Sequence, residues 1–145
     1  MTTNQLDYLY RQVVMAHAAD PHHYGEIANP TNQKTGYNPS CGDVVRLTLT
    51  VNDDQITAIA FQGEGCTISK ASASMMTDLI VNQPLSAVPS LINTFSELVR
   101  GDCEHPSELG EARLLAGVSR FPARIKCAQL PWQTLSGALA AATSE

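Results

Sequence analysis

Residues 44–51 read Val44-Val45-Arg46-Leu47-Thr48-Leu49-Thr50-Val51. From Val45 onward, apolar and polar side chains alternate, which is the pattern of a half-buried β-strand. The next four residues, Asn52-Asp53-Asp54-Gln55, supply turn chemistry, and residues 56–61 form a second run of β-branched and aromatic side chains. This stretch predicts an antiparallel hairpin.

The hairpin is also expected to bring together residues that flank it. A turn centred in the middle of residues 52–55 places Cys41 opposite Cys66, and Asp43 opposite Glu64. Directly opposed positions of an antiparallel pair lie about 4.5–5.5 Å apart at Cα. We therefore expect the thiols of Cys41 and Cys66 to converge at the open end of the hairpin.

The residues just before the hairpin carry the first candidate site. They read Asn38-Pro39-Ser40-Cys41-Gly42-Asp43, and both Pro39 and Gly42 are turn formers. The sequence thus places a thiol and a carboxylate on a short, sharply directed loop. Cys41 and Asp43 on such a loop could both reach one cation.

Length, charge and composition limit the class of protein. A chain of 145 residues has the size of one domain, so we expect a single unit spanning residues 1–145. A net charge of -5 argues against nucleic acid as a partner, because phosphate binding needs a basic surface. The sequence has no apolar run near the roughly 18 residues that span a bilayer, and residues 1–5 do not resemble a secretory signal. We expect a cytoplasmic protein that binds neither nucleic acid nor membranes.

Helical periodicity flanks the hairpin on both sides. Residues 3–19 predict an amphipathic helix that ends at Pro21. Residues 21–39 have no sustained period and predict a long connecting loop. Cys66 opens a further predicted helix, which stops at residues 82–84.

Two more helical segments are expected before the last cysteine. Residues 85–99 suit one or two helices, broken at Pro89 and ended by Gly101. Residues 107–117 suit a short helix with Ser107 as its cap. The fold class is therefore α+β.

The last cysteine precedes a final helical pattern. Cys127 is expected at the amino end of this helix, where the helix dipole, Arg124 and Lys126 would all lower the pKa of its thiol. Together with the two loop thiols and Asp43, Cys127 makes possible a tetrahedral Cys3Asp zinc site. Buried free cysteines are also common, so Cys66 and Cys127 could instead be small core residues.

Other reactive side chains are given no role in the site. The four cysteines contain no Cys-x-x-Cys pair, and reduced thiols are expected. Cys103 lies in a polar loop and is expected to be a non-ligand thiol. His22, His23 and His105 are expected to be solvated loop residues, and roles for Arg124 and Lys126 are left open.

Three separated motifs resemble one known family. They are Asn38-Pro39-Ser40-Cys41-Gly42-Asp43, the run Gly63-Glu64-Gly65-Cys66-Thr67-Ile68-Ser69-Lys70-Ala71-Ser72-Ala73-Ser74-Met75-Met76-Thr77, and Phe121 to Cys127, followed by Leu130-Pro131-Trp132. In this order they resemble the SufU branch of the iron-sulfur cluster assembly proteins, which are related to IscU and to the amino-terminal part of NifU. The chain departs from that pattern over residues 18–25, where the resemblance implies a basic, Asn-rich run.

The resemblance implies both a fold and a metal site. The fold is α+β, with a small antiparallel sheet of about three strands packed against several helices. Cys41, Asp43, Cys66 and Cys127 match the positions that bind the metal, and within this branch the metal is zinc (Zn2+). Cys41 matches the cysteine that accepts sulfur.

The resemblance also implies a function and an alternative. The implied function is that of a zinc-dependent sulfurtransferase, which accepts persulfide sulfur from a SufS-type cysteine desulfurase and passes it toward a downstream iron-sulfur assembly scaffold. IscU-type scaffolds carry histidine just before the last cysteine, where this chain has Lys126. The lysine at this position favours the sulfurtransferase over the scaffold as the interpretation of the sequence. The alternatives are an IscU-like scaffold for a [2Fe-2S] iron-sulfur cluster and a purely structural zinc site.

Overall fold

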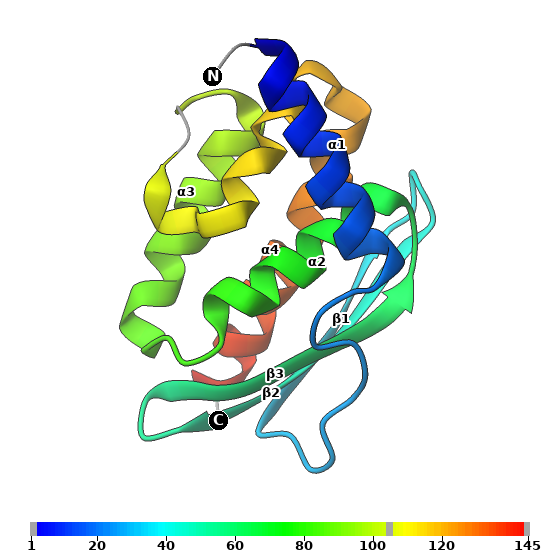
Figure 1. Ribbon diagram of the computed structural model, residues 1–145. Helices are drawn as coiled ribbons and strands as arrows, with labels where there is room; N and C mark the ends of the chain where they lie inside the picture. Colours follow the sequence, from blue (N-terminus) through cyan, green and yellow to red (C-terminus); the bar gives the residue numbers. More distant parts are fainter. Residues whose placement is uncertain (1–2, 104–105, 144–145) are drawn as a thin grey trace.

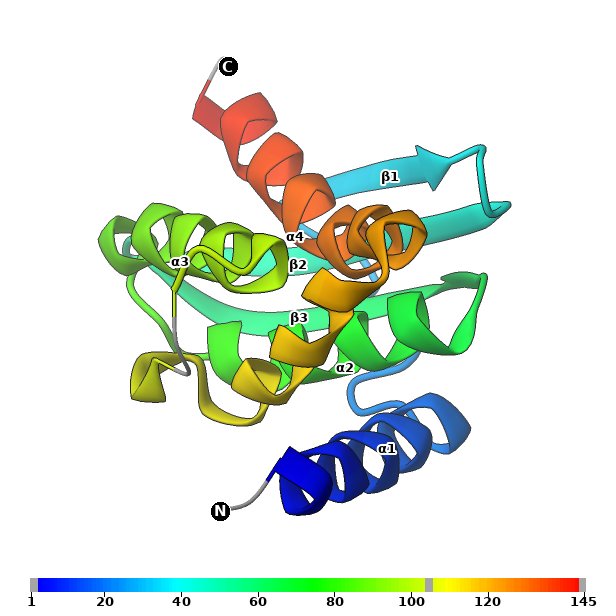
Figure 2. The ribbon, with the colours of Figure 1, turned by 90° about the horizontal axis from the view of Figure 1, so that it is seen from above.

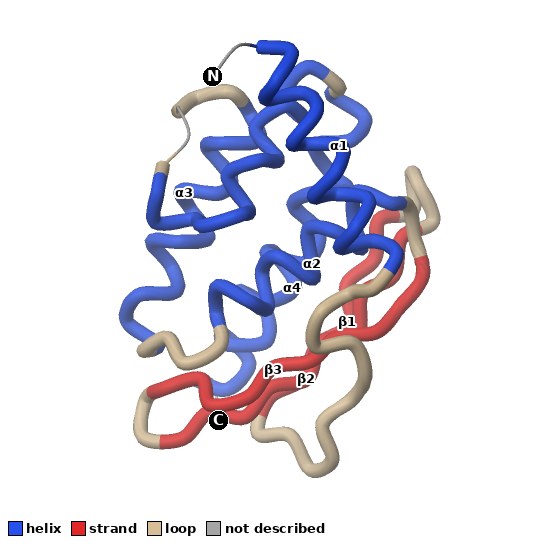
Figure 3. The backbone as a smooth tube through the Cα atoms, in the orientation of Figure 1, coloured by secondary structure: helices blue, strands red, loops and turns tan. Residues whose placement is uncertain are grey.

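The computed structural model describes residues 3–103 and 106–143 of the chain. The elements follow the order α1 (Thr3–Ala19), β1 (Asn32–Asn38), β2 (Asp43–Asn52), β3 (Gln55–Glu64), α2 (Thr67–Ile80), the short 3-10 helix η1 (Leu85–Ala87), α3 (Val88–Arg100), the 3-10 segment η2 (Ser107–Arg120) and α4 (Pro122–Thr143). Figure 3 shows the strands together in one layer, with the helices gathered on one side of it. The predicted α+β class is confirmed.

The sheet contains β1, β2 and β3 in that spatial order, and both pairs are antiparallel. The predicted hairpin of β2 and β3 is present. Asp53 and Asp54 at its turn both have positive φ, of 53° and 61°. Two successive left-handed residues characterise the tight turn whose twist matches that of paired strands.

Strand β1 lies inside the segment that was predicted to be a loop, and that prediction is wrong. Its sequence is mostly polar, so it carries no alternating apolar signal. The strand forms because its backbone pairs with β2 along its whole length and because α4 packs against it. The approach is close at Gly36, where a Cβ atom would overlap the Thr134 hydroxyl.

The register of the hairpin differs from the prediction by one residue over most of its length. Close to the turn, the strands pair as predicted. A bulge between Thr50 and Val51 then shifts the pairing, so that Val44, and not Asp43, faces Glu64. A bulge inserts one unpaired residue and increases the local twist.

Helices α2 and α4 contact the sheet, and α1 and α3 pack outside them (Figures 1 and 2). Small buried residues on α2 allow this helix to pack closely against its neighbours, and Ser72 lies near the middle of the helix. The Trp132 ring stacks on Phe95 with a centroid separation of 4.2 Å, and its indole N–H donates to the Ser72 hydroxyl at 3.0 Å. Ser72 in turn donates to the carbonyl of Ala128 at 2.6 Å. A chain of hydrogen bonds from Trp132 through Ser72 to Ala128 therefore links α4 and α2 within the apolar core.

The helix boundaries refine the predictions. Pro89 lies in the first turn of α3 and does not break it, and Gly101 ends α3 in the left-handed conformation with φ of 83°. Segment η2 runs on to Arg120 with a kink at Gly110, and no side-chain hydrogen bond caps its start, so the predicted cap at Ser107 is wrong. None of the helices within the described ranges is long and apolar enough to cross a membrane.

Candidate metal centre

Cys41 lies in the tight turn that joins β1 to β2. The N–H of Cys41 donates to the carbonyl of Asn38 at 3.2 Å, and Gly42 follows with φ of 71°. Glycine adopts this left-handed conformation without steric cost. The Cys41 side chain is exposed, so the turn presents its thiol to solvent.

The Cys127 thiol approaches Cys41 from helix α4. The thiol is buried, and its Sγ atom lies 3.3 Å from Cys41 Sγ. The ligand atoms of Cys41, Asp43 and Cys127 all lie within 4.8 Å of one another. Three of the four predicted metal ligands therefore share one location.

Asp43 is the buried acid of this group, with 1% of its surface exposed. The N–H of Cys66 donates to its Oδ1 atom at 2.9 Å, and the Ser69 hydroxyl donates to the same atom at 3.3 Å. Asn38 Nδ2 donates to Oδ2 at 3.2 Å. Because the Cys66 N–H belongs to the start of helix α2, the positive end of the helix dipole also faces this carboxylate.

These contacts decide the charge of Asp43. Burial by itself raises the pKa of the Asp43 carboxyl, but hydrogen bonds from the Cys66 N–H, Cys127, Asn38 and Ser69 outweigh it and hold the pKa below its ordinary value. Asp43 is therefore a carboxylate at neutral pH. Its oxygens are oriented before any ligand arrives.

Cys127 behaves in the opposite way, and the prediction of a lowered pKa is wrong. Burial raises the pKa of the Cys127 thiol, and hydrogen bonding with Cys41, Asp43 and Cys66 raises it further. Helix α4 begins at Pro122, so Cys127 lies in its second turn and not at its amino end. The effect of the dipole fades within the first turn.

Cys66, the fourth predicted ligand, lies at the edge of the group. It is the residue that precedes helix α2, and its side chain is partly exposed. It is not one of the three residues whose ligand atoms lie close together, although its thiol interacts with Cys127. The predicted pairing of Cys66 with Cys41 across the hairpin is absent, because Cys41 lies in the turn beyond the end of β2.

Arg124 brings a positive charge to the thiols. Its exposed guanidinium is close to Cys66 and Cys127, and the negative charge of Cys66, together with hydrogen bonds to both thiols, raises the pKa of Arg124. Lys126 is exposed nearby on the same helix, α4. The sequence left the roles of these two basic residues open. The structure places Arg124 beside the thiols and Lys126 at an exposed position on the same helix.

Two supporting residues had no role in the sequence-based interpretation. Asn38 is buried and its amide also donates to Cys127 Sγ, at 3.7 Å. Ser69 is buried beside Asp43 and also donates to the Cys66 carbonyl at 3.0 Å. Asn38 is the first residue of the turn motif, and Ser69 lies one helical turn after Cys66. These positions next to the predicted ligands were the sequence features that could have identified both residues.

The remaining reactive side chains lie away from this group. Cys103 is half-buried, and its thiol lies 3.9 Å from the carbonyl of Thr94. His22 and His23 are exposed as predicted, although both contact Asp78. The prediction for His105 lies outside the described residues.

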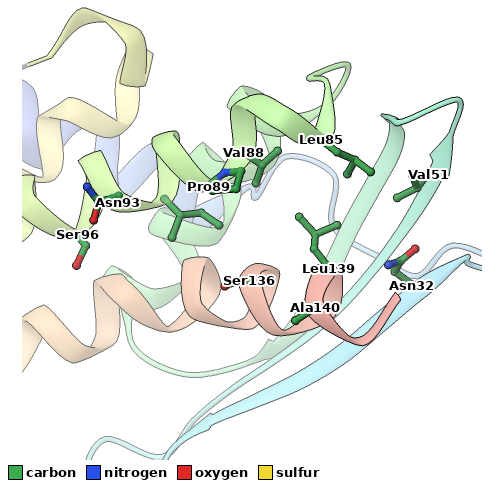
Figure 4. A pocket seen from close by; sticks show the side chains of 11 residues that line it. Asn32, Val51, Leu85, Val88, Pro89, Asn93, Ser96, Ser136, Leu139 and Ala140 are labelled. Atoms are coloured by element: carbon green, nitrogen blue, oxygen red, sulfur yellow. The ribbon is translucent and has the colours of Figure 1, made fainter. Parts of the chain in front are cut away.

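A separate pocket of about 600 Å³ opens beside α3 and the end of α4 (Figure 4). Its lining is mainly apolar and contains no cysteine, histidine or carboxylate. It therefore offers no ligand for a metal. The lining residues are Asn32, Val51, Leu85, Val88, Pro89, Ile92, Asn93, Ser96, Ser136, Leu139 and Ala140.

The fold and the thiol group together define a small α+β protein, with a helix-covered antiparallel sheet and a thiol-rich centre at one end. Residues 9–128 match the NifU-like N terminal domain family, and the chain belongs to this family. The resemblance inferred from the three sequence motifs is thereby confirmed. The family places the chain among proteins of iron-sulfur cluster assembly.

Similar proteins carry two different functional names. The chain is 46% identical over 141 residues to the iron-sulfur cluster assembly scaffold protein IscU of Streptococcus pyogenes serotype M1, covering 96% of this chain and 87% of that protein. It is 43% identical over 136 residues to the zinc-dependent sulfurtransferase SufU of Bacillus subtilis strain 168, covering 93% and 92%. A candidate SUF-system scaffold protein from Fervidobacterium islandicum AW-1 has a similar structure, with a TM-score of 0.85, 30% identity, and coverage of 91% and 97%.

Proposed function

We propose that this protein is a zinc-dependent sulfurtransferase, with Cys41 as the residue that accepts persulfide sulfur from a SufS-type cysteine desulfurase. One observation carries the proposal: the exposed thiol of Cys41 lies 3.3 Å from the buried thiol of Cys127, in a group that also contains ionised Asp43. The Bacillus subtilis relative, named a zinc-dependent sulfurtransferase, supports it. The accepted sulfur then passes to a downstream assembly scaffold.

The donor set fits zinc. Thiolate and carboxylate are both common zinc ligands, and two thiols and one carboxylate already lie within 4.8 Å of one another. Cys41, Asp43 and Cys127 would hold the ion, with Cys66 beside them as the fourth ligand. Bound zinc would keep these thiols deprotonated at neutral pH, against the raised pKa of Cys127.

Cys41 is the member of the group that can meet another protein. Asp43 and Cys127 are buried, whereas the Cys41 side chain is exposed in its turn. In the transfer step, the Cys41 thiolate attacks the outer sulfur of the desulfurase persulfide. A new S–S bond forms at Cys41, the old S–S bond breaks, and the desulfurase cysteine leaves as a thiolate. No oxidant or reductant is consumed.

Arg124 supports the same step by its charge. Its guanidinium lies beside the Cys66 and Cys127 thiols, so it adds positive charge to the thiol group that receives the anionic sulfur. A cation at this place favours a thiolate over a thiol. Arg124 therefore acts as a positioning residue for the incoming sulfur.

A second candidate is a scaffold on which a [2Fe-2S] cluster is assembled. The Streptococcus pyogenes relative with 46% identity bears that name, and thiolates also bind such clusters. Lys126 favours sulfur transfer, because it occupies the position before the last cysteine where scaffolds of the IscU type are expected to have histidine.

Metal analysis and desulfurase turnover distinguish the two candidates. The protein is purified without added metal, and its zinc, iron and visible absorption are measured before it is added to a SufS-type desulfurase. The sulfurtransferase proposal expects about one zinc bound by the thiols of each chain and faster sulfide production, both reduced in Cys41→Ser and retained in Cys103→Ser. A stable coloured iron-sulfur chromophore with little zinc, and no stimulation of the desulfurase, would favour the scaffold.

A further inference from the structure

A second group of metal-binding side chains lies farther along helix α2, away from the thiols. His17 comes from α1, His22 and His23 come from the loop that follows it, and Asp78 comes from α2; we call these four residues the histidine cluster. Asp78 lies 12 positions after Cys66, or about 18 Å along a helix at 1.5 Å per residue. The two groups therefore cannot share one ion.

The carboxylate of Asp78 lies between two imidazoles. Its Oδ2 atom is 2.6 Å from Nδ1 of His22, and its Oδ1 atom is 3.4 Å from Nδ1 of His23. The ring of His17 lies 4.6 Å from the ring of His22, centroid to centroid. One ligand atom each from His17, His22 and Asp78 lies within 4.8 Å of the others.

We propose that the histidine cluster is a second metal site, which binds a divalent first-row transition ion such as zinc through His17, His22 and Asp78. Two imidazole nitrogens and one carboxylate oxygen are the ligands that zinc uses in many three-ligand sites, where a further position stays open. His23, from the same loop, contacts Asp78 but is not one of the three residues whose ligand atoms lie within 4.8 Å of one another. Nitrogen donors also select zinc, nickel or copper over magnesium and calcium.

The surroundings of His17 support this assignment. Its ring is buried, one nitrogen lies 2.6 Å from the Ser74 hydroxyl, and the other lies 3.0 Å from a carboxylate oxygen of Glu111. Whichever nitrogen binds the ion, the other keeps an oxygen partner. Such a partner fixes the orientation and tautomer of a metal-binding histidine.

The members of the histidine cluster differ in their exposure to solvent. His22, His23 and Asp78 are exposed and can receive an ion from solvent, whereas His17 is a buried anchor. The loop that carries His22 and His23 also pairs with strand β3, since the carbonyl of His23 accepts from the N–H of Phe61 at 3.0 Å. A bound ion would therefore tie α1, α2 and the sheet edge together.

Metal titration of the full chain tests the proposal, which does not depend on sulfur transfer because no thiol takes part. Zinc binding is followed by calorimetry, and cobalt binding by absorption, since thiolate-bound cobalt gives sulfur-to-metal charge-transfer bands and nitrogen-bound cobalt does not. The wild type should bind two ions, one of them without a charge-transfer band. The NMR signals of the His17 and His22 rings should shift only as that ion binds.

Two variants and one control assign this ion to the cluster. His22→Ala and Asp78→Asn should each weaken it about tenfold or more and leave the thiolate-bound ion unchanged. Asp20→Asn removes an exposed carboxylate at the start of the same loop and should change the affinity of neither ion. The proposal is overturned if no ion lacking charge-transfer bands binds, or if that ion binds His22→Ala and Asp78→Asn as tightly as the wild type.

Discussion

Two groups of candidate metal ligands lie along helix α2, one at its start and the other in its second half. The thiol cluster (Cys41, Asp43, Cys66 and Cys127) buries its carboxylate and exposes one thiol. The histidine cluster exposes its carboxylate, Asp78, and buries one imidazole. The two groups thus reverse which kind of side chain faces solvent.

This difference in exposure suits the two groups to different chemistry. In the thiol cluster, hydrogen bonds from Asn38, Ser69 and the Cys66 N–H orient the carboxylate of Asp43, and the exposed member is the thiol of Cys41, the proposed nucleophile. In the histidine cluster, the exposed members are two imidazoles and a carboxylate, which bind cations but carry no sulfur. A rigid buried anion beneath an exposed thiol suits transfer chemistry, and an open nitrogen site suits reversible metal binding.

The largest expected contrast is between Asp43→Asn and Asp78→Asn. Asparagine at position 43 presents an NH2 group to donors that need an acceptor. Hydrogen bonds to charged groups contribute about 1.5–3 kcal/mol each, so the metal-free protein should lose about 3 kcal/mol of unfolding free energy. Asp78→Asn breaks only exposed pairs and should cost less than about 1 kcal/mol. Urea denaturation measures both, and equal losses would contradict the contrast.

The packing around Asp43 predicts a second contrast, between two glycines. A Cβ atom on Gly65 would overlap the Asp43 carboxylate and the Ser69 hydroxyl, whereas one on Gly42 meets nothing within 4 Å. Gly65→Ala should therefore cost about 2–3 kcal/mol through overpacking. Gly42→Ala should cost about 1 kcal/mol through its left-handed backbone. Thermal unfolding of the two variants checks the order, and a reversed order would mean that Asp43 is not tightly held.

A smaller effect is expected from two exposed positive charges on helix α4 near the thiol cluster. Arg124→Ala should slow sulfur acceptance from the desulfurase by about two- to fivefold, the size typical of an exposed charge interaction. Lys126→Ala removes the same charge from a neighbouring exposed position and should have little effect. Single-turnover transfer at two salt concentrations measures the difference. If the two variants slow transfer equally, only the total charge of this surface matters.

The smallest expected effect is the pH dependence of the metal-free protein. The pKa of Asp43 is lower in the folded state than its ordinary value, so its stabilisation is present at neutral pH and is lost as the pH falls through the folded pKa. The stability difference between the wild type and Asp43→Asn should narrow below about pH 4. Denaturation curves in reducing buffer test this. A stability difference that grows toward low pH would contradict the prediction, because it would mean that folding raises the pKa of Asp43.

Much of the fold could be predicted because the signals were local. The hairpin followed from alternation and turn residues, and the helical pattern that follows Cys66 predicted helix α2. Strand β1 could not be predicted, because its polar sequence is stabilised by pairing with β2 and by packing against α4. The start of α4 was missed although Pro122 is a favoured first helical residue.

The candidate site was predictable in part for the same reason. The turn at Cys41 and the adjacent Asp43 are encoded within six residues, and the three-residue group found in the structure contains both. The position of Cys66 depended on the hairpin register, which one bulge shifted. The raised pKa of Cys127 depends on burial between elements that are distant in the sequence, and periodicity alone does not report it.

The central claim is that Cys41 is the sulfur acceptor of the thiol cluster. The most direct test is a single turnover with the desulfurase and one equivalent of cysteine, after which free and persulfide thiols are alkylated and mapped by mass spectrometry. We predict that the added sulfur is found on Cys41, and that Cys41→Ser accepts none while Cys103→Ser accepts it normally. Sulfur located on another cysteine, or transfer at the normal rate to Cys41→Ser, would contradict the account.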